Sequence, residues 1–586
     1  MRFRVARAKC LGSCCPPYTN PNAQSRQLPI APFPPLPRPA MAIPEFPADL
    51  LQSPSSSEFP AISRPDTPSY HPLHTFALPK GQDRHYVQQY ADMYFLRLAQ
   101  LKPIVEQVAE EAWEGFEIAG ERARRVERVL DVRQGQACWV VGTVFMQMAL
   151  KPDVLDDISK EHWIAAPPPR EKYMSPDGNG DEIMLEDESG RLHISGSILR
   201  EHPLVTGAIV AAIGSENKHG VFEVIDIRVA DLPPQPERWA LSEPPATKTP
   251  PSSKKIAIVS GLNISGTSTD SLALDLLLEY LLGEAGDASS ASQITRLIIA
   301  GDSISKGSPI PTREDLATRS KISGSGTGAA ARKFGYDASA YNAAPIERLD
   351  AFLAELLPSI PVTILPGASD PANVAVPQQP LHPALFRQSR AYMKSPAAGD
   401  EAEAGWLDAV TNPWEGEVEG WRLLGSGGQN VNDVAKYVGV SSSGGAAAGE
   451  GEGEAMDVDG GDGDGAAKGQ TSTDDDSDRC ELMDALLRWR CVAPTAPDTL
   501  WSYPFQDDDP FLLARCPHLF FAGNQPRFAT DLVRGPADQL VRLVAVPRFC
   551  DTGLVVLVNV GGGDEEEGKD GEEVLGVEVV RVVAEG

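Results

Sequence analysis

The chain has 586 residues, with 52 Lys and Arg against 82 Asp and Glu, which gives a formal net charge of −30 at pH 7. A nucleic-acid binder that works through bulk charge needs a surplus of basic residues, so this balance argues against that class. No apolar run approaches the roughly 18 residues of a membrane span, and the 8 cysteines form no CxxC pair, which argues against a zinc site or a disulfide framework.

The first 80 residues are rich in Pro, Ser and Ala. A segment of this composition buries too little apolar area to offset the entropy of ordering, so we expect residues 1–80 to be disordered. The first 44 residues contain no acid, and their basic residues include Arg2, Arg4, Arg7 and Lys9. This pattern is compatible with an organellar transit peptide, but the simpler interpretation is an extension ahead of a true start at Met41.

Residues 81–135 place apolar side chains at helical spacing and predict N-terminal helices, which Pro103 would kink or divide. From 136 to 235 the pattern changes to short alternating apolar runs separated by turn signals such as Asp187-Glu-Ser-Gly190. Four or five strands in roughly 100 residues predict an OB-type β-barrel.

Residues 236–253 are rich in proline and predict a linker. Beyond them, in residues 254–586, continuous apolar strands end in glycine and alternate with helical runs, as at Leu297-Ile-Ile-Ala-Gly-Asp302. This pattern indicates a sheet covered on both faces, so the predicted fold class is α+β or α/β. Residues 441–479 are rich in Gly, Ser and acidic residues, and we expect them to be a disordered insertion.

Four strand ends carry the candidate functional residues, because active sites of α/β sheets are built on the loops at the carboxyl ends of the strands. The motifs are Gly261-Leu-Asn263, Gly301-Asp-Ser-Ile-Ser305, Gly367-Ala-Ser-Asp370 and Gly523-Asn-Gln-Pro526. Their order and spacing resemble the calcineurin-like metallophosphoesterases, whose corresponding motifs are D-x-H, G-D-x-x-D, G-N-H-[DE] and G-H-x-H.

The resemblance lies in the order and spacing of the four motifs and not in the metal-ligating residues of that family. The positions that correspond to family ligands are Gly261, Asn263, Asp302, Ser305, Ser369, Asp370, Asn524 and Pro526. Of these, only Asp302 and Asp370 keep the residue type of the family pattern, and only two histidines, His382 and His518, occur after residue 252. A two-metal site needs several carboxylates and imidazoles, so the sequence predicts no catalytic, metal or cofactor residue. The alternative interpretation is structural, with glycines in tight turns and Asp302 as a cap.

An OB-type barrel followed by such a domain resembles the B-subunits of replicative DNA polymerases. Several stretches are similar to the polymerase delta B-subunits in particular: Tyr86-Val-Gln-Gln-Tyr90, Leu185-Glu-Asp-Glu-Ser-Gly-Arg191, Gly425-Ser-Gly-Gly-Gln-Asn430-Val-Asn-Asp433 and Gly523-Asn-Gln-Pro-Arg-Phe528. The similarity extends from about residue 76 to 560. The long N-terminus, the Gly-rich residues 323–331 and the acidic insertion depart from the family.

The resemblance implies an OB barrel followed by an inactivated calcineurin-like phosphoesterase β-sandwich flanked by helices. It implies a non-catalytic, nuclear scaffold subunit of DNA replication and repair. Such subunits hold the Cys-rich C-terminal domain of the catalytic polymerase chain and bind a third, smaller subunit, which couples the enzyme to the sliding clamp and indirectly to DNA. No cofactor and no membrane contact is expected.

Two other functions stay open at this point. One is a residual metal-dependent phosphodiesterase or exonuclease built on Asp302, Asp370 and Asp433. The other is the B-subunit of polymerase alpha or epsilon, against which the Tyr86–Tyr90 stretch argues.

Three further features have two interpretations each. We expect Trp406, Trp414 and Trp421 to pack a local core rather than to form interface hot spots. The barrel has few aromatic residues and a thin basic lining, so we expect interdomain structure rather than an independent reader of single-stranded DNA. We expect residues 450–478, with 11 acids and one Lys, to be a solvated loop rather than a DNA mimic.

Overall fold

The structure is a computed structural model. It describes residues 63–79, 90–118, 120–152, 170–175, 180–244, 254–265, 271–305, 343–394, 404–438, 478–561 and 574–582. The predictions for residues 1–62 and for nearly all of 441–479 lie outside these ranges. None of the helices described there has the length and the hydrophobicity that a membrane crossing requires.

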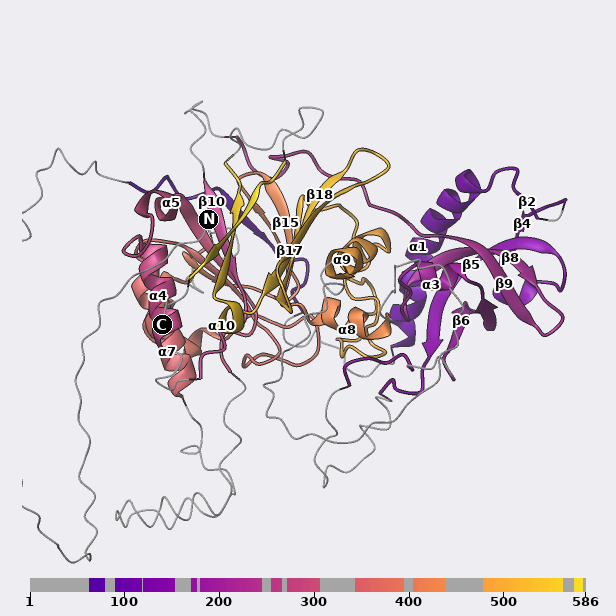
Figure 1. Ribbon diagram of the computed structural model, residues 1–586, viewed down its shortest axis with the longest axis horizontal. Coiled ribbons are helices and arrows are strands. Elements are labelled where there is room, and N and C mark those ends of the chain that lie inside the picture. Colours follow the sequence, from indigo (N-terminus) through magenta and orange to yellow (C-terminus); the bar gives the residue numbers. More distant parts are fainter. Residues whose placement is uncertain are drawn as a thin grey trace, which may run out of the picture.

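A closed sheet of six strands forms the part of the molecule at the right of Figure 1. The strand order is β4-β5-β6-β7-β9-β8, and β5 also pairs with β8, which closes the sheet into a small barrel as predicted. Its strands are β4 (Arg124–Arg125), β5 (Ala137–Gln147), β6 (Glu182–Glu186), β7 (Arg191–Ser195), β8 (Ile209–Glu216) and β9 (Val221–Arg228). The short elements beside them are β2 (Glu117–Ile118), β3 (Glu121–Arg122), η3 (Val129–Asp131) and α3 (Ile198–Glu201).

Helix α1 (Ala91–Ala112) covers one side of this barrel. Its buried residues Leu98, Leu101 and Val105 form one apolar cluster with barrel residues such as Trp139 and Ile209. The helix is continuous through Pro103, so of the two expected effects of this proline, a kink or a division, the division is wrong. Pro103 and Ala99 are exposed, so the carbonyl that loses its helical partner to the proline is accessible to solvent.

Two six-stranded sheets form the second part of the molecule. Sheet I has the order β13-β12-β11-β10-β19-β20, and sheet II has the order β1-β14-β15-β16-β18-β17. Sheet I consists of β10 (Lys255–Val259), β11 (Ile294–Ala300), β12 (Val362–Leu365), β13 (Leu407–Ala409), β19 (Leu554–Asn559) and β20 (Val577–Arg581). Sheet II consists of β1 (Tyr70–Leu73), β14 (Trp414–Val418), β15 (Trp421–Ser426), β16 (Leu519–Gln525), β17 (Ala529–Arg534) and β18 (Leu540–Pro547).

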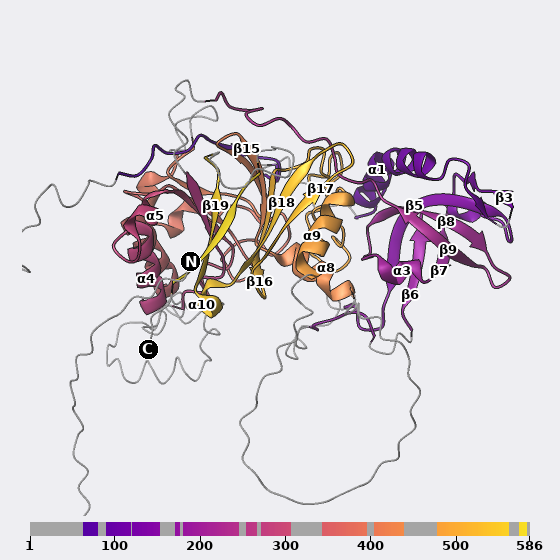
Figure 2. The same cartoon turned by 45° about the horizontal axis from the view of Figure 1, so that its top comes forward.

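The sheets pack face to face and each is covered by helices on its outer face (Figure 2). The inner core joins Ile258 and Ile298 of sheet I to Leu423 and Phe521 of sheet II. Helices α4 (Ser271–Leu282) and α7 (Ala344–Leu356) pack on sheet I, whereas α8 (Gln429–Tyr437) and α9 (Asp478–Arg488) pack on sheet II. The short helices are α5 (Ala288–Ser292), η7 (Pro383–Leu385), η8 (Ser389–Tyr392) and α10 (Phe549–Thr552). The continuous apolar strands therefore reflect burial on both faces.

Residues 63–79 form an N-terminal strap on the second part, so the prediction of disorder up to residue 80 is wrong for this stretch. Strand β1 pairs antiparallel with β14 at the edge of sheet II. Ahead of it, the Arg64 guanidinium donates to the carbonyls of Leu281, Ala291 and Ile294. Behind it, Phe76 is fully buried against Phe511. The strap is ordered by these tertiary contacts and not by its own composition.

The first part of the predicted linker is also hydrogen-bonded to the second part of the molecule. Gln235 exchanges hydrogen bonds with the backbone of Leu540, and Arg238 donates to the carbonyls of Glu419 and Val560. The Arg238 guanidinium stacks over the Trp421 ring at 4.3 Å. Residues 231–244 therefore lie along sheet II rather than forming a free tether.

The barrel and the second part share a core. One apolar cluster contains Val140 and Phe222 of the barrel together with Leu486 and Phe520 of the second part. Within this seam, the buried Arg97 of α1 forms an ion pair with Asp509 at 2.6 Å. A shared core and a buried ion pair fix the relative orientation of the two parts.

Candidate functional site

The four strand-end motifs meet at one edge of the two sheets, as expected for loops at the carboxyl ends of neighbouring strands. Gly261 N donates to Gly301 O at 2.9 Å, and Asn263 N donates to Asp302 O at 3.0 Å. Asn524 N donates to Ser260 Oγ at 3.0 Å, which connects the loop after β16 to the end of β10. The sequence motifs thus identify residues that are neighbours in space.

Glycine backbones fill the centre of this edge. A Cβ atom on Gly301 would lie 3.1 Å from Gly427 Cα and 3.2 Å from Gly367 Cα, and a Cβ atom on Gly523 would clash with the carbonyl of Ala300. Gly428 adopts a φ of +89° at the start of α8, a conformation that favours glycine. The glycines therefore allow the loops to pack directly against one another.

Asp370 binds backbone amides from two loops. Its carboxylate accepts hydrogen bonds from Gly367 N at 2.8 Å, Ile304 N at 3.0 Å and Ser303 N at 3.2 Å. Burial raises the pKa of Asp370 to about 6, although these three hydrogen bonds act in the opposite direction. This carboxylate joins the loop after β11 to the loop after β12.

Asp302 makes a second connection between the same loops. Its Oδ1 accepts a hydrogen bond from Ser369 N at 2.9 Å, and Ser369 Oγ donates to Ile304 O at 2.6 Å. Asp302 has a φ of +54°, a left-handed conformation that Asp tolerates better than most residues. The carboxylates of Asp302 and Asp370 are therefore both hydrogen-bonded to the protein backbone.

Amide side chains bind the loop ahead of α8 to its neighbours. Asn524 Nδ2 donates to Gly427 O at 3.0 Å, and Gly427 N donates to Asn412 Oδ1 at 2.8 Å. Asn412 also donates to Gln378 and to Gln429, at 2.9 and 2.8 Å. Asn524, one of the eight predicted positions, thus makes a loop-to-loop hydrogen bond.

The other predicted positions divide into two groups. Gly261 lies inside the cluster, because a Cβ atom there would lie 2.7 Å from Asn524 Oδ1. Asn263 and Ser305 are half-buried and hydrogen-bonded through their backbones, and Pro526 is exposed. No group of three or more His, Cys, Asp or Glu residues within the described part of the chain is arranged to hold a metal ion.

Asp433 does not join this cluster. It lies on α8, where its carboxylate accepts hydrogen bonds from Tyr173 Oη at 3.0 Å and from the hydroxyls of Thr495 and Thr499, each at 2.6 Å. Burial raises the pKa of Asp433. Because Tyr173 belongs to the barrel, this buried aspartate connects the two parts of the molecule.

The seam around Asp433 is a feature that the sequence interpretation missed. Lys151 of the barrel forms an ion pair with Asp498 at 2.7 Å, and Tyr437 Oη donates to the same carboxylate at 3.0 Å. Lys172 Nζ donates to the carbonyl of Ala435 near the C-terminus of α8. The only sequence signal was Asp433 within a motif shared with the polymerase delta B-subunits, and it gave no indication of its partner.

Neither of the two histidines after residue 252 lies among the strand-end loops. His382 caps η7 through a hydrogen bond from Ala384 N. His518 accepts a hydrogen bond from Arg422 N at 3.0 Å, and burial, with the charges of Arg238 and Arg422, lowers its pKa to about 4. Its structural role agrees with the expectation from its position before an apolar strand.

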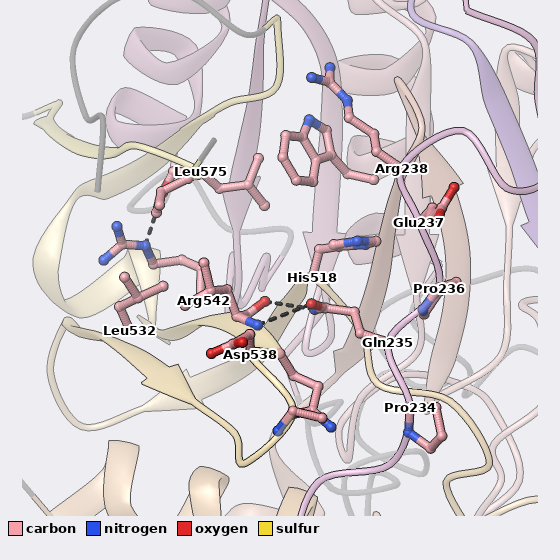
Figure 3. A pocket seen from close by; sticks show the side chains of 15 residues that line it. Pro234, Gln235, Pro236, Glu237, Arg238, His518, Leu532, Asp538, Arg542 and Leu575 are labelled. Atoms are coloured by element: carbon pink, nitrogen blue, oxygen red, sulfur yellow. Dashed lines mark hydrogen bonds between the residues drawn. The ribbon is translucent and has the colours of Figure 1, made fainter. Parts of the chain in front are cut away.

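A pocket of about 530 Å³ lies beside His518 and away from the strand-end loops (Figure 3). The proline-rich residues 234–238 form one wall, and the turn between β17 and β18 forms another. Arg542 closes a third side through a hydrogen bond to Leu575 O at 2.9 Å. The pocket contains none of the eight predicted positions, so it gives no support to a phosphoesterase site.

Two of the three tryptophans follow the expected core packing. Trp414 and Trp421 are buried between the sheets, but Trp406 is 41% exposed beside β13. The prediction of core packing is therefore wrong for Trp406 alone, because it precedes a strand at the edge of sheet I.

Comparisons with known proteins agree with this architecture. Residues 89–227 match the family described as DNA polymerase delta subunit OB-fold domain, and residues 256–530 match the family of the DNA polymerase alpha/epsilon B-subunits. The first of these matches confirms the OB fold of the barrel.

Curated relatives extend the similarity over most of the chain. The DNA polymerase delta small subunit of Saccharomyces cerevisiae is 34% identical over 481 residues, which cover 81% of this chain and 88% of the relative. The DNA polymerase delta small subunit of Arabidopsis thaliana is 34% identical over 477 residues, covering 81% and 89%. The DNA polymerase delta subunit 2 of Drosophila melanogaster is 30% identical over 485 residues, covering 82% and 92%. The chain belongs to the DNA polymerase delta small-subunit family.

Proposed function

We propose that this chain is a non-catalytic scaffold subunit of DNA polymerase delta in the nucleus, with roles in DNA replication and repair. In this role it binds the Cys-rich C-terminal domain of the catalytic subunit and a third, smaller subunit. Through these subunits it couples the enzyme to the sliding clamp and indirectly to DNA. Its second part is an inactivated calcineurin-like phosphoesterase β-sandwich. Membership of the small-subunit family supports the assembly role.

The observation that supports the non-catalytic proposal is that Asp302 and Asp370 accept hydrogen bonds from backbone amides and so connect neighbouring loops. Asp370 accepts three backbone N–H groups, and Asp302 accepts one. A metal site needs carboxylate lone pairs that are directed at a common cation. The separation of Asp433, which binds Tyr173 and two threonines, removes the third carboxylate of the enzyme alternative.

The eight vestigial positions then have structural roles in this proposal. Gly261, Asn263, Asp302, Ser305, Ser369, Asp370, Asn524 and Pro526 lie in loops that pack against one another. A sheet edge whose loops are fastened in this way offers a preformed surface. Preformed surfaces lose little conformational entropy on binding, which suits a scaffold.

The seam gives a second line of support. A scaffold that joins two partners must keep its own parts in a fixed relation. The buried Arg97–Asp509 pair and the shared core provide that rigidity.

The test is a co-purification of the full chain with the C-terminal Cys-rich domain of the catalytic polymerase delta subunit, followed by size-exclusion chromatography. A stable 1:1 complex, with no bound metal in the small subunit by elemental analysis, is the expected result. Metal-dependent hydrolysis of a phosphodiester by the chain alone, lost in Asp302→Ala, would overturn the non-catalytic proposal. The chain used must retain residues 63–79, because the strap is part of sheet II.

A further inference from the structure

We infer that the seam carries a docking surface for a partner segment with an apolar anchor flanked by Lys or Arg. This inference rests on the assembly role proposed above and places it on the molecule. The surface consists of Tyr90, Val374 and Trp501, with Asp507 and Asp508 at its rim, and is called the seam patch below.

Three large apolar side chains are exposed at the seam patch. Tyr90 is 38%, Trp501 45% and Val374 82% exposed. They come from three segments: the start of α1, the loop 499–505 and the loop after β12. Solvent-exposed aromatic and aliphatic residues gathered in one place are typical of interaction sites, and Tyr and Trp are enriched in binding hot spots.

Hydrogen bonds hold the three segments together. Tyr90 Oη donates to Ser502 O at 3.0 Å, which binds the start of α1 to the loop 499–505. Val376 N donates to Trp501 O at 2.7 Å, and Tyr503 N donates to Val376 O at 2.9 Å, which bind that loop to the loop after β12. The backbone segments that carry the exposed side chains are therefore held together by hydrogen bonds.

The layer beneath the seam patch is buried. Val376 and Ser502, which take part in these hydrogen bonds, are both buried. Two turns further along α1, Arg97 binds Asp509 at 2.6 Å and the carbonyl of Ala496 at the same distance. A partner at this place contacts both the barrel side and the second part, and it needs no rearrangement of either.

The charge at the rim selects the kind of partner. Asp507 and Asp508 are exposed and lie between Ser502 and Asp509, the two residues that fasten this loop to α1. Residues 499–508 contain no Lys or Arg. Acidic rims attract basic segments and accelerate their association. We therefore expect the partner to be a segment of the catalytic polymerase subunit. Its apolar side chain would pack against Trp501, and its basic side chains would pair with Asp507 and Asp508.

The experiment uses the full chain and the catalytic subunit of polymerase delta, with dissociation constants measured by titration at two salt concentrations. Trp501→Ala is expected to weaken binding at least tenfold. The double variant Asp507→Lys/Asp508→Lys alters only exposed residues, and it is expected to weaken binding and to remove most of its salt dependence. Trp406→Ala is the matched control, because Trp406 is similarly exposed but lies away from the seam, and its affinity is expected to equal that of the wild type.

The outcomes separate the two proposals. If the wild-type chain forms no complex, the assembly role is overturned and the seam patch loses its partner with it. If the wild-type complex forms and both the Trp501→Ala and the charge-reversed variants bind as tightly as wild type, the docking surface is wrong while the assembly role stands. If Trp501→Ala instead increases amide hydrogen exchange elsewhere in the isolated chain, a segment of this chain covers the patch, and the proposed occupant is wrong. In a parallel titration with the third subunit, a variant that binds the catalytic subunit like wild type but no longer binds the third subunit would also contradict the choice of partner.

Discussion

Ser69 and Glu419 form a reciprocal pair of hydrogen bonds. Ser69 N donates to Glu419 Oε1 at 3.0 Å, and Glu419 N donates to Ser69 O at 3.0 Å. The same carboxylate accepts from Lys254 Nζ at 2.8 Å, and the Glu419 carbonyl accepts from Arg238. One residue in the turn between β14 and β15 therefore fastens the N-terminal strap, the first part of the predicted linker and the start of β10.

This arrangement predicts a graded response to substitution of Glu419. Glu419→Ala should lower the free energy of unfolding by about 2 kcal/mol, because it leaves the half-buried Lys254 without its partner and the Ser69 amide without an acceptor. Glu419→Gln keeps an acceptor oxygen and should lose only about 1 kcal/mol. Urea unfolding measures both values, and equal losses for the two variants would contradict this assignment.

The Arg97–Asp509 pair predicts a strongly non-additive pair of variants. Arg97→Met removes one partner and leaves a buried carboxylate, so the free energy of unfolding should fall by about 3–5 kcal/mol. Adding Asp509→Leu removes that uncompensated charge and should recover a large part of the loss. A double-mutant cycle by urea unfolding gives the coupling. Additive losses would mean that the two side chains do not depend on each other.

The strap shows where sequence interpretation fails. The residues of β1, Tyr-His-Pro-Leu, include a proline and have no alternating pattern. They form a strand because β14 offers a free edge and because Tyr70 Oη binds Asp408 at 2.5 Å while its ring covers the buried Arg296 at 3.7 Å. These partners lie more than 200 residues away along the chain, and no local pattern identifies them.

The strand-end loops show where sequence interpretation succeeds. Continuous apolar strands that end in glycine identify the parallel core of sheet I and bring Asp302 and Asp370 together. The hydrogen bonds that occupy the two carboxylates come from backbone amides, which carry no sequence signal. The sequence therefore identifies which residues meet, while the structure shows that backbone amides of the neighbouring loops donate to the two carboxylates.

A related prediction concerns the glycines at that edge. Gly523→Ala should prevent folding or lower the free energy of unfolding by more than about 3 kcal/mol, because its Cβ would overlap the carbonyl of Ala300. Gly576→Ala is the matched control, since its nearest atom, Asn559 Cβ, is 3.9 Å away. Its change should stay within about 0.5 kcal/mol. Thermal unfolding of both variants tests the close packing of the loops, and equal stability would contradict it.

Removal of the strap predicts a defect that can be repaired in trans. A chain that begins at residue 80 loses β1, the Arg64 contacts with the carbonyls of α4 and α5, and the buried Phe76. Its thermal midpoint should fall by several degrees, since a loss of about 1 kcal/mol corresponds to about 2–4 °C in a domain of 150–250 residues. A synthetic peptide of residues 63–79 should restore part of the loss at saturating concentration. A peptide with Tyr70→Ala and Phe76→Ala is the control and should restore less; equal rescue by both peptides would contradict the role of these side chains.

His518 predicts a loss of stability in mild acid. Its pKa is lowered to about 4 in the folded chain, chiefly by burial, whereas an unfolded histidine has a pKa of about 6.5. A group with a lowered folded pKa contributes stability that is complete above about pH 6.5 and is lost as the pH falls toward 4, because the unfolded state binds the proton first. The contribution of His518 is therefore about 3 kcal/mol across this range. His518→Gln keeps an acceptor for the Arg422 amide and does not titrate, so the comparison cancels the titration of all other groups. Urea unfolding at pH 7 and at pH 4.5 should show a larger fall for the wild type than for the variant, and parallel falls would mean that His518 titrates normally in the folded chain.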